Sequence, residues 1–105
     1  MIARIWTGHV PRNKRDAYLT LMKNVALSEY RATPGNQGAF CLHREEGLFE
    51  RFDMLTFWID KDAIRAFAGD DVELAKYYDF DDDYLIEKAE FVTHFNVSPS
   101  PSNDF

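Results

Sequence analysis

The chain has 105 residues, a formal net charge of -6, 46% hydrophobic residues and 15% aromatic residues. This length fits one domain with a two-layer core, and the apolar content argues against wholesale disorder. The chain is negatively charged and has no basic stripe, which argues against nucleic-acid and membrane-surface partners. It has no apolar run long enough to span a bilayer, and Cys41 has no second cysteine with which to form a disulfide. We therefore expect a cytoplasmic protein.

A change in the spacing of apolar residues, from every second residue to every third or fourth, predicts a first strand followed by a first helix. Residues 2 to 8 alternate apolar with polar or small side chains, which predicts a strand ending near Gly8. Pro11 suits the first turn of a helix, and Pro34 with Gly35 ends that helix. Three- and four-residue spacing predicts its apolar stripe, which contains Tyr18, Leu21, Met22, Val25 and Ala26.

Two strands follow between residues 38 and 59, joined by a tight turn at Glu46 and Gly47. The second strand is apolar on both faces, because side chains alternate across a strand. One face carries Phe52, Met54 and Trp58, and the other carries Leu55, Phe57 and Ile59. Neither face of this strand suits exposure to water.

The second half of the chain predicts a capped helix and a last strand. Asp60 is placed to cap a helix with Ile64, Phe67 and Ala68 on its buried side and Gly69 at its end. Asp70 or Asp71 is predicted to start a short helical segment that reaches Tyr78, followed by an acidic loop. Residues 88–97 predict a fourth strand with Thr93 and Phe95 on one face and Val92 and His94 on the other. Residues 98–105 predict a flexible tail after a domain of residues 1–97.

The predicted order is βαββαβ, a ferredoxin-like α+β fold with a four-stranded antiparallel sheet and both helices on one face. The other face would then expose large apolar side chains. In one of the two possible assignments of alternating residues to the sheet faces, these are Leu55, Phe57, Phe91, Phe95 and Val97. Hydrating them would cost a large share of a domain's stability. We therefore expect a homodimer through the helix-free sheet face.

The sequence resembles the antibiotic biosynthesis monooxygenase-like family of the dimeric α+β barrel superfamily, and more narrowly a bacterial branch of it. The resemblance covers about residues 1–97 and is carried by TFWIDKDAIRAFAGDD, with YRATPGNQG, FAGDDVELAKYY and VTHFNV. It implies a pocket between sheet and helices and, as in the cofactor-free oxygenases, a protein that supplies shape, dryness and hydrogen bonds. The heme-degrading branch uses an Asn, a Trp and a His where this chain has Ile5, Phe67 and Tyr77, so heme chemistry is not expected.

Aromatic and imidazole side chains are the candidate site residues. His94 could orient a phenol or accept its proton, or be a structural histidine with one hydrogen bond. Tyr77 is the second catalytic candidate, although either it or its neighbour could simply close the core. Substrate-binding candidates are Trp58, Tyr78, Trp6, Phe67 and Arg31. Core packing is the alternative for Trp58, and capping or surface solvation is the alternative for Arg31.

No metal or cofactor is expected. Asp79, Asp81, Asp83 and Glu90 superficially match a calcium loop, but Tyr84 stands where that loop requires Gly. The sequence therefore predicts a cofactor-independent monooxygenase-like protein acting on a small aromatic, quinol or polyketide-type compound. The alternative is a non-enzymatic ligand-binding or stress-response protein, or an isomerase or lyase of the same fold.

Overall fold

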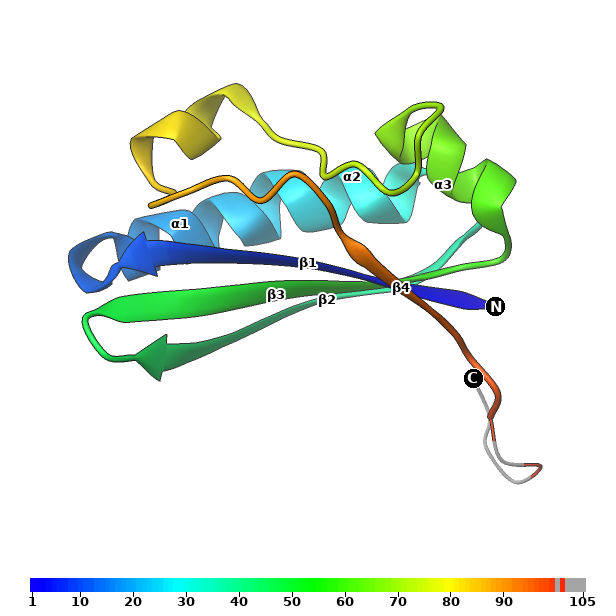
Figure 1. Cartoon of the computed structure of the whole chain (residues 1–105), viewed down its shortest axis with the longest axis horizontal. Coiled ribbons are helices and arrows are strands. Elements are labelled where there is room, and N and C mark those ends of the chain that lie inside the picture. Colours follow the sequence, from blue (N-terminus) through cyan, green and yellow to red (C-terminus); the bar gives the residue numbers. More distant parts are fainter. Residues whose placement is uncertain (100, 102–105) are drawn as a thin grey trace.

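The computed structural model describes residues 1–99 and 101, so the predicted flexible tail at residues 98–105 lies largely outside the described residues. One antiparallel sheet has the strand order β2-β3-β1-β4 (Figure 1). Its strands are β1 (Ile2–Pro11), β2 (Asn36–Glu46), β3 (Phe49–Trp58) and β4 (Thr93–Asn96). The predicted ferredoxin-like βαββαβ order is confirmed, with the helices on one face of the sheet.

Strand β1 is longer than predicted, because Gly8 lies within it rather than at its end. The indole ring of Trp6 lies over Gly8, and a Cβ at that position would stand 2.4 Å from a ring carbon. Gly8 therefore makes room for a neighbouring aromatic ring rather than for a turn. The strand ends at Pro11, which opens a single 3-10 turn, η1 (Arg12–Lys14).

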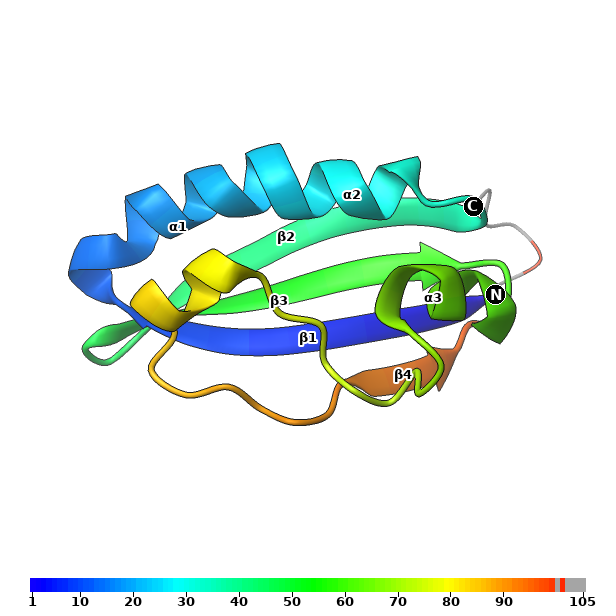
Figure 2. The ribbon, with the colours of Figure 1, turned by 90° about the horizontal axis from the view of Figure 1, so that it is seen from above.

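The helical run from Arg12 to Ala32 packs on the β2 and β3 side of the sheet (Figure 2). It consists of α1 (Arg15–Leu21), a π-helical turn η2 (Met22–Ala26) and α2 (Leu27–Ala32). Its buried side chains are four residues apart: Tyr18, Met22, Ala26 and Tyr30. A four-residue step overshoots an α-helical turn of 3.6 residues, and the wider π turn takes up that excess. The predicted stripe is confirmed except for Val25, which is exposed.

The hairpin of β2 and β3 turns at Gly47 and Leu48, one residue later than predicted, and Gly47 has φ +61°. The partition of β3 is confirmed. Phe52, Met54 and Trp58 are buried under the helices, while Leu55 and Phe57 lie on the opposite face. After β3, α3 (Lys61–Ala68) begins at Asp60, whose carboxylate accepts a hydrogen bond from the amide of Ala63 at 2.9 Å. The predicted cap is confirmed.

Residues 69–92 differ most from the predictions. The expected helical segment after Asp70 is absent, because this stretch pairs with the residues before β4 instead. The amide of Ala75 donates to the carbonyl of Glu90, and the amide of Val92 donates to the carbonyl of Glu73, both at 2.9 Å. The acidic loop forms a 3-10 turn, η3 (Asp79–Asp83). Strand β4 is shorter than predicted, because only Thr93–Asn96 pair with β1.

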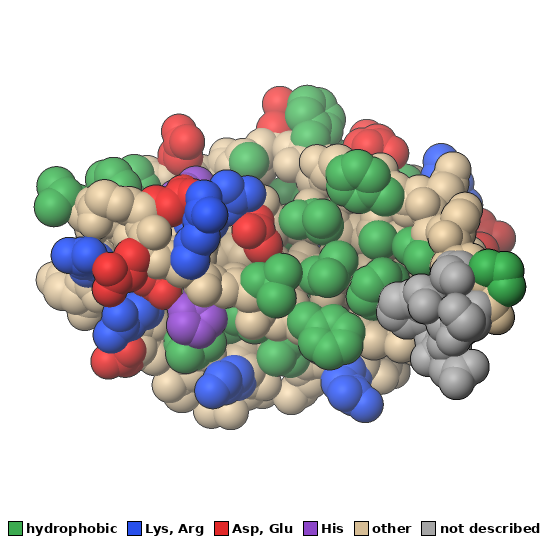
Figure 3. Space-filling view, turned by 90° about the horizontal axis from the view of Figure 1, so that it is seen from below, with side chains coloured by type: hydrophobic (Ala, Val, Ile, Leu, Met, Phe, Trp, Pro, Cys, Tyr) green, Lys and Arg blue, Asp and Glu red, His purple; other side chains and the backbone are tan. Residues whose placement is uncertain are grey.

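The helix-free face of the sheet is divided into an apolar half and a charged half (Figure 3). The apolar half is exposed at Phe40, Leu42 and Phe95, each about half accessible at 50 to 53%, beside Leu55 and Phe57. The charged half carries Arg44, Glu46, Arg51 and Asp53. Among the described residues, every helix is too short and polar to cross a bilayer.

Candidate functional site

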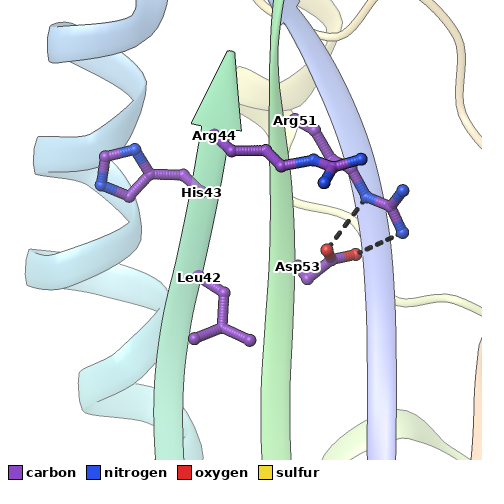
Figure 4. A pocket seen from close by; sticks show the side chains of 5 residues that line it. All are labelled: Leu42, His43, Arg44, Arg51 and Asp53. Atoms are coloured by element: carbon purple, nitrogen blue, oxygen red, sulfur yellow. Dashed lines mark hydrogen bonds and ion pairs between the residues drawn. The ribbon is translucent and has the colours of Figure 1, made fainter. Parts of the chain in front are cut away.

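Two surface cavities stand out, one on the helix-free face of the sheet and one at its β4 edge. The first, about 340 Å³, lies on the helix-free face beside Leu42, Arg44, Arg51 and Asp53 (Figure 4). Its charges are already paired: Arg51 contacts Asp53 at 3.0 Å, and Arg44 contacts Glu46 at 2.6 Å. This cavity therefore offers a ligand few unused polar groups, and we do not place the functional site there.

His43 contributes to the first cavity but its ring points to the other face, toward the helical run (Figure 4). Its Nδ1 contacts the carboxylate of Glu50 at 2.7 Å, and the ring stacks on Phe52. The imidazole is thus held by a buried acid and an aromatic ring. It lies on edge strand β2, at the opposite edge of the sheet from β4.

The second cavity, about 420 Å³, lies at β4 and contains the predicted catalytic residue His94. The register of β1 and β4 places Arg4 opposite His94, and both side chains lie on the helix side of the sheet. The walls come from the start of β1, the start of α3, Glu73 and residues 92–96. The lining residues are Ile2, Lys61, Glu73, Val92, Thr93, His94, Phe95 and Asn96.

His94 is almost enclosed, with a side chain that is 10% exposed. Neither ring nitrogen has a hydrogen-bond partner within the described part of the chain, and the nearest carboxylate oxygen, on Glu73, is 3.6 Å from Nδ1. Burial lowers the pKa of His94, opposed by the nearby negative charge of Glu73. The ring is therefore mainly neutral at pH 7 and is able to accept a proton.

Arg4 is a charged residue buried in the sheet, only 1% exposed. Its Nη2 donates one hydrogen bond to the carbonyl of Leu74 at 3.0 Å, and its Nε has no partner among the described residues. No carboxylate of the described residues forms an ion pair with it, and burial lowers its pKa. The sequence analysis missed this residue, although an arginine on the inward face of an apolar strand was a visible signal.

The predicted residue Phe67 lies in the core next to two cations. Its ring centroid is 4.3 Å from the ammonium of Lys76 and 5.7 Å from the guanidinium of Arg4. Lys76 also pairs with Glu29, which accepts a hydrogen bond from the hydroxyl of Tyr78 at 2.6 Å. Burial opposes ionisation of Glu29, but these two hydrogen bonds hold its pKa below the usual value. The hydroxyl of Tyr78 is therefore used to tie residues 76–78 to α2.

Tyr77, in the irregular segment formed by residues 69–92, packs edge to face against Trp6 of β1, with ring centroids 6.1 Å apart. The hydroxyl of Tyr77 donates to the carbonyl of Ala89 at 2.5 Å, and burial raises its pKa. The indole nitrogen of Trp6 has no hydrogen-bond partner among the described residues. Neither side chain lines the cavity that holds His94.

Trp58 and Arg31 lie outside the candidate site. Trp58 is fully buried and its indole nitrogen donates to the hydroxyl of Thr56 at 2.8 Å, which favours the alternative that it anchors the core. Arg31 is exposed near the end of α2, as the surface alternative predicts. The cavity thus brings together His94 and Glu73, of which only His94 was selected from the sequence, while Arg4 is the register partner of His94 but does not line the cavity.

The acidic loop closes over the helical run instead of presenting all its carboxylates to solvent. Asp81 is buried and accepts hydrogen bonds from the hydroxyl of Tyr18 at 2.8 Å and from the amide of Tyr78 at 2.7 Å. Burial raises the pKa of Asp81. Within the described residues, no group of three histidine, cysteine or acidic side chains could hold a metal ion.

Comparison with known proteins leaves the family open. No protein-family model matches this chain, and no curated protein matches it significantly. The family resemblance drawn from the sequence therefore stays a prediction.

Proposed function

We propose that the protein binds a small aromatic phenol, quinol or polyketide-type compound in the cavity beside His94 and oxidises it with O₂ without a cofactor. The observation that carries this proposal is an almost enclosed imidazole with two unpaired nitrogens on the wall of a cavity of about 420 Å³. Buried polar atoms are normally paired, and an exception calls for an explanation such as a catalytic role or a bound group. A hydroxyl group of a ligand fits this unpaired position.

The chemistry assigned to the site needs only a proton acceptor and a dry cavity. Neutral His94 accepts the acidic proton of the bound compound, which leaves an electron-rich anion that reacts with O₂. In an anthrone-type substrate, a ring CH₂ becomes C=O, and the second oxygen atom leaves as water with the two hydrogens. The four electrons for O₂ therefore all come from the substrate.

Oxygen uptake with 1,8-dihydroxyanthrone and 1,4-naphthohydroquinone tests this proposal directly. We expect the wild-type protein to oxidise at least one of them well above the blank rate. The H94Q variant should lose about a hundredfold or more, which is typical for removal of a general base. H43Q is the matched control, because His43 lies on the opposite edge strand, and it should keep the wild-type rate.

Two outcomes would contradict the oxygenase proposal. Oxidation no faster than the blank for both compounds, or full activity in H94Q, would reject it. Retention of either compound without O₂ consumption would favour the alternative of a ligand-binding protein.

The pH dependence of turnover follows from the state of His94. Since burial lowers its pKa from 6.5, the neutral base predominates at pH 7 and above and is lost as the pH falls through the lowered pKa. We expect a rate that changes little above pH 7 and an acid limb with its midpoint below 6.5. A midpoint above that value would contradict the assignment.

We also propose that two chains associate through the helix-free face of the sheet. Phe40, Leu42 and Phe95 are each about half exposed there, and a contiguous apolar surface of this kind typically marks an interface. Burying a large apolar side chain contributes about 1.5–3 kcal/mol. A second copy of the chain would supply apolar surface of the same composition.

Light scattering at micromolar concentration tests the dimer. We expect the wild-type protein to have twice the mass of the chain and the F40E variant to be monomeric, since it places a charge in the apolar half. L48E is the matched control, because Leu48 is 78% exposed at the hairpin turn, and it should remain dimeric. A monomeric wild-type protein would reject this part of the proposal.

A further inference from the structure

We propose that Glu73 is a positioning residue for His94: its carboxylate holds the Nδ1–H group of the ring, which leaves Nε2 to accept the proton of the bound compound. The inference rests on the proposed function for the identity of the base, but the pairing of the two side chains does not depend on reaction with O₂. It gives a role to a residue that was not selected from the sequence.

The first argument is the position of Glu73. Both side chains line the cavity at β4, and Oε1 of Glu73 lies 3.6 Å from Nδ1 of His94. No other carboxylate of the described residues lies within ion-pair distance of this ring. The partner of one ring nitrogen decides which nitrogen of a neutral imidazole carries the proton. Since an ionised carboxylate only accepts hydrogen bonds, Glu73 favours the tautomer with the proton on Nδ1.

The second argument is the backbone that carries Glu73. Its carbonyl accepts a hydrogen bond at 2.9 Å from the amide of Val92, which stands two residues before His94. Its own amide donates to the carboxylate of Asp71 at 3.1 Å. The backbone of Glu73 is thus fixed from both sides. The irregular segment brings this side chain to His94 through paired backbone groups, not through a chance approach of two exposed side chains.

The third argument is the difference in exposure between the two partners. The side chain of His94 is 10% exposed and that of Glu73 is 54% exposed, so the ring is enclosed while the carboxylate has room to change its rotamer. A separation of 3.6 Å is longer than a hydrogen bond, and catalytic contacts of this kind often shorten only during the reaction. Once His94 takes up a proton, the attraction of opposite charges draws the carboxylate toward the ring.

The charges around His94 single out Glu73. Three charged groups act on the ring from the elements packed around it: Glu73 of the irregular segment, Arg4 of β1 and Lys61 of α3. Burial lowers the pKa of His94, the negative charge of Glu73 raises it, and the two cations lower it. Of these three groups, Glu73 alone stabilises the imidazolium form. Without it, the ring would be a weaker base.

Proton transfer then uses both ring nitrogens of His94. Nε2 takes the acidic proton of the bound compound, and the electron pair stays on the compound as its anion. The proton on Nδ1 remains there and donates to Glu73, so the carboxylate is not itself protonated. When the product forms, the proton on Nε2 becomes one of the two hydrogens that leave in water.

The closing experiment follows the ring nitrogens of the histidines by NMR of the ¹⁵N-labelled protein, with H94Q identifying the His94 signals by their loss. In the wild type at pH 8 we expect the Nδ1–H tautomer of His94. E73A, which removes the acceptor, should give a mixture of tautomers. E73Q, which keeps an acceptor but removes the charge, should make His94 titrate at a lower pH. Both variants should fold, because Glu73 is more than half exposed.

The matched control is E87Q, which removes an exposed carboxylate outside the cavity and should leave both NMR readings unchanged. Oxygen uptake with 1,8-dihydroxyanthrone gives a second reading. We expect E73Q to lower kcat about tenfold, which is part of the roughly hundredfold or more that a general base contributes. Its KM should stay near the wild-type value, because Glu73 acts through His94, and its acid limb should move to lower pH.

The outcomes separate this inference from the proposed function. An Nε2–H tautomer of His94 in the wild type would overturn it, as would the same titration midpoint in E73Q and the wild type. An E73Q protein with the wild-type kcat would also overturn it. The NMR readings need neither ligand nor O₂. A tautomer and a titration that both depend on Glu73, without any oxygen uptake, would therefore support the pairing and reject the oxygenase reaction.

Discussion

The two halves of the helix-covered sheet face differ in how completely their polar groups are satisfied. Over β2 and β3, a continuous helical run buries side chains at every fourth residue. Over β1 and β4, the cover is short α3 and the irregular residues 69–92 (Figure 2). Of the six buried side-chain atoms without a hydrogen-bond partner in the described chain, four belong to β1 and β4, on Arg4, Trp6 and His94. The β1 and β4 half therefore holds more unpaired polar atoms than the β2 and β3 half, which has one on Asn36 and one on Glu50.

The two covers are joined through two carboxylates, one on Asp81 and one on Glu29. Asp81, in the irregular segment, accepts from Tyr18 of α1, and Glu29 of α2 binds both Lys76 and Tyr78. The segment is thus attached at its middle, while its contact with Arg4 is a single hydrogen bond to a carbonyl. The unpaired polar groups therefore lie where the sheet is covered by short and irregular segments, and this is also where the proposed site lies.

The largest expected effect comes from opening a void under the helical run. Met22 is 2% exposed, so M22A should lower the free energy of unfolding by about 2–5 kcal/mol. Urea unfolding measures the change. V25A, which truncates an exposed residue of the same turn, should cost under about 1 kcal/mol. Equal costs for the two variants would mean that the helical half is not packed as described.

The next effect compares two tyrosine hydroxyls. Y18F removes a hydrogen bond to a buried carboxylate and should cost about 1.5–3 kcal/mol. Y77F removes a hydrogen bond to the carbonyl of Ala89, on the solvent side of the segment, and should cost under about 1 kcal/mol. The comparison would break down if urea unfolding gave Y77F the larger cost.

Substitution of Gly8 tests how tightly the Trp6 side chain is packed over β1. A Cβ at this position would overlap the indole ring and lie 2.9 Å from a side-chain carbon of Leu85, so G8A should cost about 1–3 kcal/mol and alter tryptophan fluorescence. In G38A the added carbon lies 3.4 Å from the nearest atom, so that control should change stability much less. An unchanged fluorescence spectrum in G8A would show that Trp6 does not depend on this glycine.

The smallest effect concerns the start of α3. D60A removes the side-chain acceptor of the Ala63 amide and should cost about 0.5–2 kcal/mol by urea unfolding. D62A, on the exposed face of the same helix, should cost less. If D62A proved the more damaging, the cap assigned to Asp60 would be wrong.

The order of elements was predictable because local signals and tertiary structure agree. The two-faced pattern of β3, the turn glycine at residue 47 and the cap at Asp60 each depend on a few adjacent residues. The helical pattern after Asp70 failed, because its backbone groups pair with Glu90 and Val92, which lie far along the chain. Backbone hydrogen bonds between segments that are far apart in the sequence override the local helix propensity here.

The candidate site was predictable only in part. His94 was selected because it stands among apolar neighbours in a strand, and it does line a cavity. Glu73 was missed, because its importance depends on the pairing of β4 with β1 and on the path of the irregular segment. Trp58 could not be separated from a core anchor by sequence, since both roles favour a large aromatic ring after a buried strand.

The most direct test of the central claim, a ligand site beside His94, is anaerobic titration of the wild type, H94F and H43F with 1,8-dihydroxyanthrone. Phenylalanine keeps an aromatic ring at the position but cannot form hydrogen bonds. We predict that H94F weakens binding at least tenfold and that H43F binds like the wild type. Equal affinity in all three proteins, or a loss confined to H43F, would contradict the account.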